Sequence, residues 1–93
     1  MKKILVQFSN PGMTAKQFDQ AWDELRKAGQ EHPYGLIHHV AGQQGNNWVV
    51  VDVWESAEAM DEFGKTLMPI LSNNGIPQVQ PTILPLHYEY IGK

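Results

Sequence analysis

The residues of this sequence that could carry chemistry lie in three short stretches, each typical of a β-strand. LIHHVAG, residues 36–42, contains His38 and His39; WVVVDVW, residues 48–54, contains Asp52; and LPLHYEYI, residues 84–91, contains His87. Imidazole exchanges protons near neutral pH, and a neighbouring carboxylate stabilises its charged form and orients the ring. If these strands pair, histidine and Asp52 side chains form an acid–base site.

Two strand registers bring different histidines to Asp52. Adjacent residues of a strand point to opposite faces, so only one of His38 and His39 can share a face with Asp52. A shift of the hairpin by one residue exchanges them, and the sequence pattern leaves both registers open. Two histidines and a carboxylate also match a metal site in outline, but single residues on three strands are a weak ligand pattern, and we predict no metal. Each histidine alone also fits an ordinary, partly exposed strand residue.

Composition and motifs exclude several classes of function. The net charge is −3 and the seven basic residues are scattered, which is untypical of a nucleic-acid-binding protein. The sequence has no cysteine, and therefore no disulfide, thiolate metal site or thiol nucleophile. It also lacks a G-x-S-x-G motif and a phosphate-binding glycine loop. No apolar run approaches the ~20 residues of a membrane span, so we expect no membrane association and a cytoplasmic location.

The 93 residues are expected to form one domain, residues 1–93, from six elements. Alternating apolar residues predict a first strand that ends at the turn Asn10-Pro11-Gly12. Thr14 and Gln17 form a capping box before an amphipathic helix, and Ser56 caps a second helix that Pro69 should kink or end. The first helix is predicted at residues 15–28, and three further strands are predicted at residues 36–41, 48–54 and 82–91.

The order βαββαβ predicts an α+β fold of the ferredoxin-like type: a four-stranded antiparallel sheet with two helices on one face. In the strand 48–54, Val49, Val51 and Val53 suit packing against the helices. The alternate residues, with Trp48, Asp52 and Trp54 among them, would then form the other face, which is too apolar to lie in water. We therefore expect a homodimer that packs sheet against sheet, with an aromatic cavity between sheet and partner or simply a packed dimer core.

HVAG, VVDVWESAEAMDEF and LPLHYEYI together resemble the dimeric α/β-barrel superfamily, near its antibiotic biosynthesis monooxygenase-like proteins. The resemblance spans nearly the whole chain and is strongest at Trp54-Glu55-Ser56 with the following Glu58-Ala59. It implies a dimeric α/β barrel. In these relatives the histidine directly before VAG recurs, so the resemblance selects His39, and not His38, for the cavity.

The superfamily includes cofactor-independent oxygenases that act on polycyclic aromatic phenols. The resemblance thus implies a small-molecule oxygenase that monooxygenates an activated aromatic or phenolic compound. His39, supported by Asp52, would take the phenolic proton, and His87 would polarise a carbonyl group. The residues predicted to bind the substrate are Trp48, Trp54, His38, Tyr34 and Phe63.

Two other functions stay open at this point. Haem-degrading members of the superfamily place a ligating histidine where this sequence has Phe63, and an asparagine where it has Gln7. Both differences count against haem, and no cofactor is predicted. The alternative to an enzyme is a noncatalytic dimer that binds a small hydrophobic metabolite, or a protein interaction module without a ligand.

Overall fold

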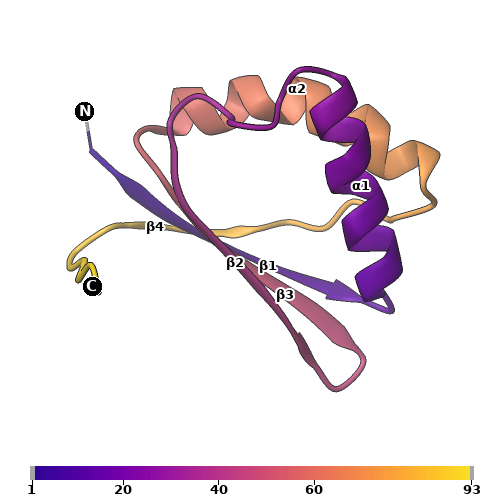
Figure 1. The fold of residues 1–93 in the computed structure, drawn as a ribbon. Helices are drawn as coiled ribbons and strands as arrows, with labels where there is room; N and C mark the ends of the chain where they lie inside the picture. The colour runs from indigo at the N-terminus through magenta and orange to yellow at the C-terminus, as the bar shows by residue number, and fades with distance from the viewer. Residues whose placement is uncertain (1, 93) are drawn as a thin grey trace.

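The computed structural model describes residues 2–92 and has the predicted element order βαββαβ. The four strands and two helices are β1 (Ile4–Pro11), α1 (Ala15–Lys27), β2 (Leu36–Gln44), β3 (Asn47–Trp54), α2 (Ala57–Asn73) and β4 (Thr82–Pro85). The strands form one antiparallel sheet in the order β2-β3-β1-β4. Both helices cover the same face of this sheet (Figure 1). The predicted ferredoxin-like fold is thereby confirmed.

Both helices begin at the predicted caps. The Thr14 hydroxyl accepts a hydrogen bond from the backbone N–H of Gln17, and the Gln17 side chain accepts one from the N–H of Thr14, which completes a capping box. The Ser56 hydroxyl accepts from the N–H of Ala59 at 3.1 Å. Pro69 was predicted to kink or end the second helix. It lies inside α2, which continues beyond it to Asn73, so the predicted end at this proline is wrong.

The last strand is shorter than predicted. β4 ends at Pro85, and residues 86–92 form no regular structure, so His87 lies outside the sheet. The segment is held to the strand edge by the backbone N–H of Leu86, which donates to the carbonyl of Lys3. Prolines without an amide donor cannot sustain a strand ladder, which agrees with the early end of pairing.

The two faces of β3 are oriented opposite to the prediction. Val50, Asp52 and Trp54 point toward the helices and are buried. Val49, Val51 and Val53 alternate with them and lie on the face that the helices leave open, where Val53 is also buried. Trp54 fills the space beneath α2, where its ring lies 5.4 Å from the ring of Phe63. Large aromatic side chains fill the gap between sheet and helices, and the smaller branched valines form a flatter outer surface.

Two apolar clusters form the core between sheet and helices. Val6, Trp54 and Ala59 make the first, and Ala21, Leu25 and Ile70 make the second. Phe63 of α2 packs against both clusters. Within residues 2–92, neither helix is long and apolar enough to cross a membrane.

Candidate functional site

Hairpin pairing brings His39 and Asp52 together on the helix-covered face. In the β2–β3 register His39 lies directly opposite Asp52, while His38 lies opposite Val53. An irregularity in the pairing between Leu36 and His38 inserts Ile37 as an extra residue. Because a bulge changes which face the following residues occupy, Leu36 and His39 both face the helices and His38 faces away.

His39 and Asp52 form a partly buried, hydrogen-bonded pair. His39 Nδ1 lies 2.5 Å from Asp52 Oδ1, and Asp52 is only 7% exposed. An ionised carboxylate can only accept, so neutral His39 carries its proton on Nδ1 and keeps a lone pair on Nε2. The Nε2 atom is buried and has no hydrogen-bond partner among residues 2–92. The pair therefore offers one free basic nitrogen with a fixed orientation.

Aromatic residues of α1 enclose the imidazole ring. Phe18 stacks on His39 with ring centroids 5.7 Å apart and planes 3° apart. Trp22, one helical turn further along, meets the same ring edge-on at 5.0 Å. Residues four apart lie on the same face of a helix, so the rings of Phe18 and Trp22 both contact His39 of the sheet. They hold the imidazole in place and cover much of its surface.

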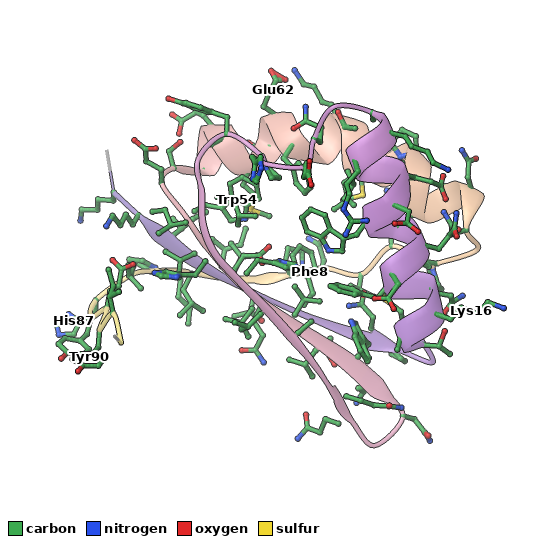
Figure 2. All side chains as sticks on the ribbon, in the orientation of Figure 1. Phe8, Lys16, Trp54, Glu62, His87 and Tyr90 are labelled. Carbon is green, nitrogen blue, oxygen red and sulfur yellow. The ribbon has the colours of Figure 1, made fainter. Side chains whose placement is uncertain are left out.

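His39 and Asp52 line a cavity of about 80 Å³ between the sheet and the helices. Its other walls are mainly apolar and come from β1, both helices and residues 76–79, among them Phe8, Leu25, Leu67 and Ile76. Figure 2 shows Phe8 and Trp54 beneath the helices, on the side of the sheet where this cavity lies. A cavity bounded by one chain differs from the predicted cavity between sheet and dimer partner, because the face that carries Asp52 is the face that the helices cover.

Several residues predicted for the site lie elsewhere. His38 points to the open face of the sheet, where its Nε2 lies 2.7 Å from the Glu89 carboxylate. Tyr34, in the loop before β2, is 82% exposed. His87 lies beside Glu89 in the C-terminal segment and, with Tyr90, at the end of the molecule remote from Phe8 (Figure 2). These three residues do not meet His39, because strand alternation and the early end of β4 separate them from it.

The predicted aromatic residues divide into two groups. Phe63 lines the cavity. Among the described residues 2–92 that form its wall, Trp48 and Trp54 do not appear. Trp54 is 1% exposed and donates its indole N–H to Asp52 Oδ2 at 3.4 Å. Trp48 packs against Phe18 with ring centroids 5.3 Å apart, and its buried Nε1 has no partner among residues 2–92. Neither tryptophan is placed to stack on a substrate in the cavity.

The described residues offer no obvious metal site. Among residues 2–92, no three His, Asp or Glu side chains lie close enough together to hold an ion. His38 and His39 point to opposite faces, so they cannot share a ligand sphere. The chemistry that this arrangement provides is proton transfer at His39 Nε2 in an apolar space.

Phe18 and Trp22 are site residues that the sequence reasoning assigned only to the apolar stripe of the first helix. Their contact with His39 follows from the packing of α1 across the hairpin. The available signal was their spacing of four residues on one apolar helix face, which is equally typical of ordinary core residues.

No family model matches this sequence, and neither does any curated protein. Several solved structures, in contrast, have a similar fold. A mutant form of SnoaB, a cofactor-independent oxygenase from Streptomyces nogalater, superposes with a TM-score of 0.70 at 11% identity, over 96% of this chain and 97% of that chain. A Caulobacter crescentus protein provisionally named an antibiotic biosynthesis monooxygenase gives 0.66 at 14% identity, over 96% and 92%.

A dimeric ferredoxin-like protein from an uncultured marine organism gives a TM-score of 0.65 at 11% identity and covers 100% of this chain and 95% of that chain. All three similarities extend over almost the entire length of both chains, at identities that establish the fold alone. The chain therefore shares the ferredoxin-like α+β fold of these structures.

Proposed function

We propose that this protein is a small-molecule oxygenase that needs no cofactor and acts on an activated aromatic or phenolic compound. One observation carries the proposal: His39 is oriented by Asp52 at 2.5 Å and has a buried, unpartnered Nε2 at an apolar cavity, within the described residues 2–92. Such a nitrogen requires a hydrogen-bond donor, and a phenolic hydroxyl is a donor that also has an apolar body. SnoaB, a cofactor-independent oxygenase with the same fold, supports this class of reaction.

The reaction begins with proton transfer. His39 Nε2 takes the proton of the phenolic hydroxyl, and Asp52 stabilises the resulting imidazolium. The phenolate is electron-rich enough to react with oxygen directly. One oxygen atom replaces the hydrogen of a ring carbon, and the other leaves as water, so a phenol and O₂ give a quinone and H₂O. The substrate supplies all the electrons, and the proton held on His39 returns to the leaving water.

The apolar walls of the cavity favour this sequence of steps. Phe18 and Trp22 cover the imidazole, and leucine side chains of both helices exclude water from its surroundings. In a medium of low polarity, the attraction between imidazolium and carboxylate is stronger than in water. A desolvated phenolate is likewise a stronger electron donor to oxygen.

Oxygen consumption with a panel of activated phenols tests the proposal. Wild-type protein should consume oxygen with at least one of them, and His39→Asn should lower the rate by roughly 10²- to 10⁴-fold, as expected for loss of a general base. His38→Asn is the matched control, because it changes the neighbouring histidine on the opposite face of the sheet. Equal rates for His39→Asn and wild type would exclude His39 as the base.

Binding without catalysis is the second candidate, and the apolar walls of the cavity favour it. In that case a small hydrophobic metabolite should raise the melting temperature of the protein, while no phenol supports oxygen consumption. Ligand-dependent melting of His39→Asn separates the two candidates. A ligand held by apolar walls alone stabilises this variant as much as wild type.

We also propose that two copies of the chain associate through the open face of the sheet. That face carries Val40, Val49 and Val51, together with Leu84 of β4. Val40 is 61% exposed and Leu84 is 49% exposed in the single chain. A neighbour with the same fold is a dimeric ferredoxin-like protein, which supports a homodimer here.

A further inference from the structure

We propose that Trp54 is a positioning residue for the acid–base pair: its indole N–H fixes the Asp52 carboxylate, and the carboxylate in turn fixes His39. The consequence for catalysis rests on the proposed function, but the effect on His39 does not. The family resemblance implies that Trp54 binds the substrate, whereas its burial away from the cavity wall calls for another role.

The carboxylate of Asp52 divides its two oxygens between two donors. Oδ1 faces His39 Nδ1 at 2.5 Å, and Oδ2 accepts the N–H of Trp54 at 3.4 Å. The last side-chain torsion of aspartate has broad, shallow minima, so a carboxylate with one partner turns readily. A second donor on the other oxygen restricts that rotation. Asp52 Oδ1 is then kept oriented for its hydrogen bond with His39 Nδ1.

Trp54 can serve as a fixed donor because its own ring is fully buried and packed on several sides. Residues i and i+2 of a strand point to the same face, so the Trp54 ring lies next to the Asp52 carboxylate along β3. The ring is 1% exposed, packs with Val6 and Ala59, and contacts Phe63 with ring centroids 5.4 Å apart. A rigid support behind the first contact residues of a site maintains their geometry.

The other two tryptophans do not share this position. Trp22 meets the His39 ring edge-on from α1, and the Trp48 indole nitrogen has no partner among residues 2–92. Trp48 is therefore a matched comparison for Trp54: both are on β3 and both point to the helix-covered face, but only Trp54 donates to Asp52.

Nitrogen-15 NMR of the His39 ring tests the inference without a substrate. At a pH where His39 is neutral, the ring of the wild-type protein should carry its proton mainly on Nδ1. Trp54→Phe keeps an aromatic ring but removes the N–H, so the two ring-nitrogen shifts should move toward each other as the Nε2–H tautomer gains population. Trp48→Phe should leave both shifts unchanged. Wild-type shifts in a folded Trp54→Phe protein would overturn the inference.

A second measurement applies even if Trp54→Phe fails to fold. In Asp52→Asn the charged acceptor of the Trp54 indole proton becomes neutral, so the proton resonance of Trp54 Nε1–H should move upfield, while that of Trp22 stays near its wild-type position. An unchanged Trp54 resonance would show that the indole makes no hydrogen bond to Asp52, and would overturn the inference.

Kinetics separate this inference from the proposed function. Because Trp54 acts through Asp52 and does not line the cavity, Trp54→Phe should lower kcat by about tenfold, the size typical of an outer-shell partner, with KM unchanged. If no variant or wild-type protein consumes oxygen but Trp54→Phe shifts the His39 tautomer, the proposed function fails and the positioning role stands. If the wild-type protein consumes oxygen but Trp54→Phe leaves the His39 tautomer unchanged, the positioning role fails and the proposed function stands.

Discussion

At the scale of single residues, the chemistry of the cavity depends on which imidazole nitrogen carries the proton. Free imidazole can carry it on either nitrogen, whereas the Asp52 carboxylate holds it on Nδ1 of His39. The lone pair that remains on Nε2 is buried among apolar side chains. Leaving a buried acceptor without a partner costs roughly 1–3 kcal/mol, a cost that a ligand hydroxyl would remove.

Gly35 is a second residue on which the site depends, through backbone conformation and not through chemistry. It precedes β2, has a φ of +85°, and its carbonyl accepts the backbone N–H of Glu55 at 2.7 Å. A Cβ at this position would lie 2.5 Å from the Cβ of Ala59. We expect Gly35→Ala to lower the free energy of unfolding in urea by roughly 2 kcal/mol or more, because strain and steric overlap add.

Gly64 provides the matched control for this prediction. It lies inside α2, and a Cβ added there would meet no atom within 4 Å beyond its chain neighbours and the surrounding helix backbone, among the described residues. Alanine is the better helix former, so Gly64→Ala should raise the free energy of unfolding by about 0.5–1 kcal/mol. The same chemical change is thus expected to have opposite signs at the two positions. A Gly35→Ala protein as stable as wild type would contradict the contact with Ala59.

At the scale of elements, the C-terminal segment is tied to the sheet by charge. The Glu89 carboxylate lies 3.0 Å from Lys3 Nζ and 2.7 Å from His38 Nε2. The hydrogen bond from Lys3, followed by that from His38, lowers the pKa of Glu89 below its usual 4.5. A carboxyl whose pKa is lower in the folded state stabilises the fold above its unfolded pKa. That stabilisation is lost as the pH falls through the folded pKa.

Glu89→Gln should therefore lower the melting temperature at neutral pH, and the difference from wild type should shrink as the pH falls below 4.5. Thermal unfolding followed by circular dichroism across this pH range measures both effects. Glu31→Gln, in the loop between α1 and β2, is the control, since no ion pair of Glu31 is seen among residues 2–92. A constant difference between Glu89→Gln and wild type at all pH values would contradict the charge contact.

The order of the elements and the starts of both helices followed from local signals in the sequence, whereas the end of β4 and the orientation of β3 did not. Caps at Thr14 and Ser56 and the turn after Asn10 are properties of a few neighbouring residues. The face of a strand depends on its partners. Ile4, Val6 and Phe8 of β1 are plainly apolar, and their pairing with Trp54, Asp52 and Val50 fixes the buried face of β3. Only the register between β1 and β3 carries that information, and sequence patterns leave it undetermined.

The same reasoning explains which part of the candidate site was predictable. That His39 and Asp52 could meet followed from the hairpin, and family resemblance favoured His39 over His38. The bulge before His38 sets the register in the structure, and no residue type marks it in the sequence. His87 was expected at the cavity as part of a last strand over residues 82–91, and Tyr34 as a substrate-binding residue. The end of β4 at Pro85 and the exposed loop at Tyr34 hold both of them away.

At the scale of the whole molecule, the reversed orientation of β3 changes what a dimer would bury. The tryptophans are already covered by the helices, so the face left for a partner consists of smaller side chains. Val40 and Val51 are directly opposite each other in the β2–β3 pair, and Leu5 is opposite Leu84 in the β1–β4 pair. An apolar sheet face of this kind can pack on a copy of itself about a twofold axis. The cavity, in contrast, lies on the helix-covered side of the sheet and is lined by residues of one chain.

Val40→Lys tests this assembly, because a charge at the centre of an apolar interface must lose its water without gaining a partner. Wild-type protein should sediment as a dimer at micromolar concentration, and Val40→Lys should weaken the dimer by at least roughly tenfold while its circular dichroism stays unchanged. Gln20→Lys on the exposed surface of α1 adds the same charge away from the sheet and should remain dimeric. Because the His39–Asp52 pair lies on the helix-covered face, the ring-nitrogen shifts of His39 should be the same in the monomeric variant as in wild type. A wild-type monomer at these concentrations would refute the proposed dimer and leave the cavity intact.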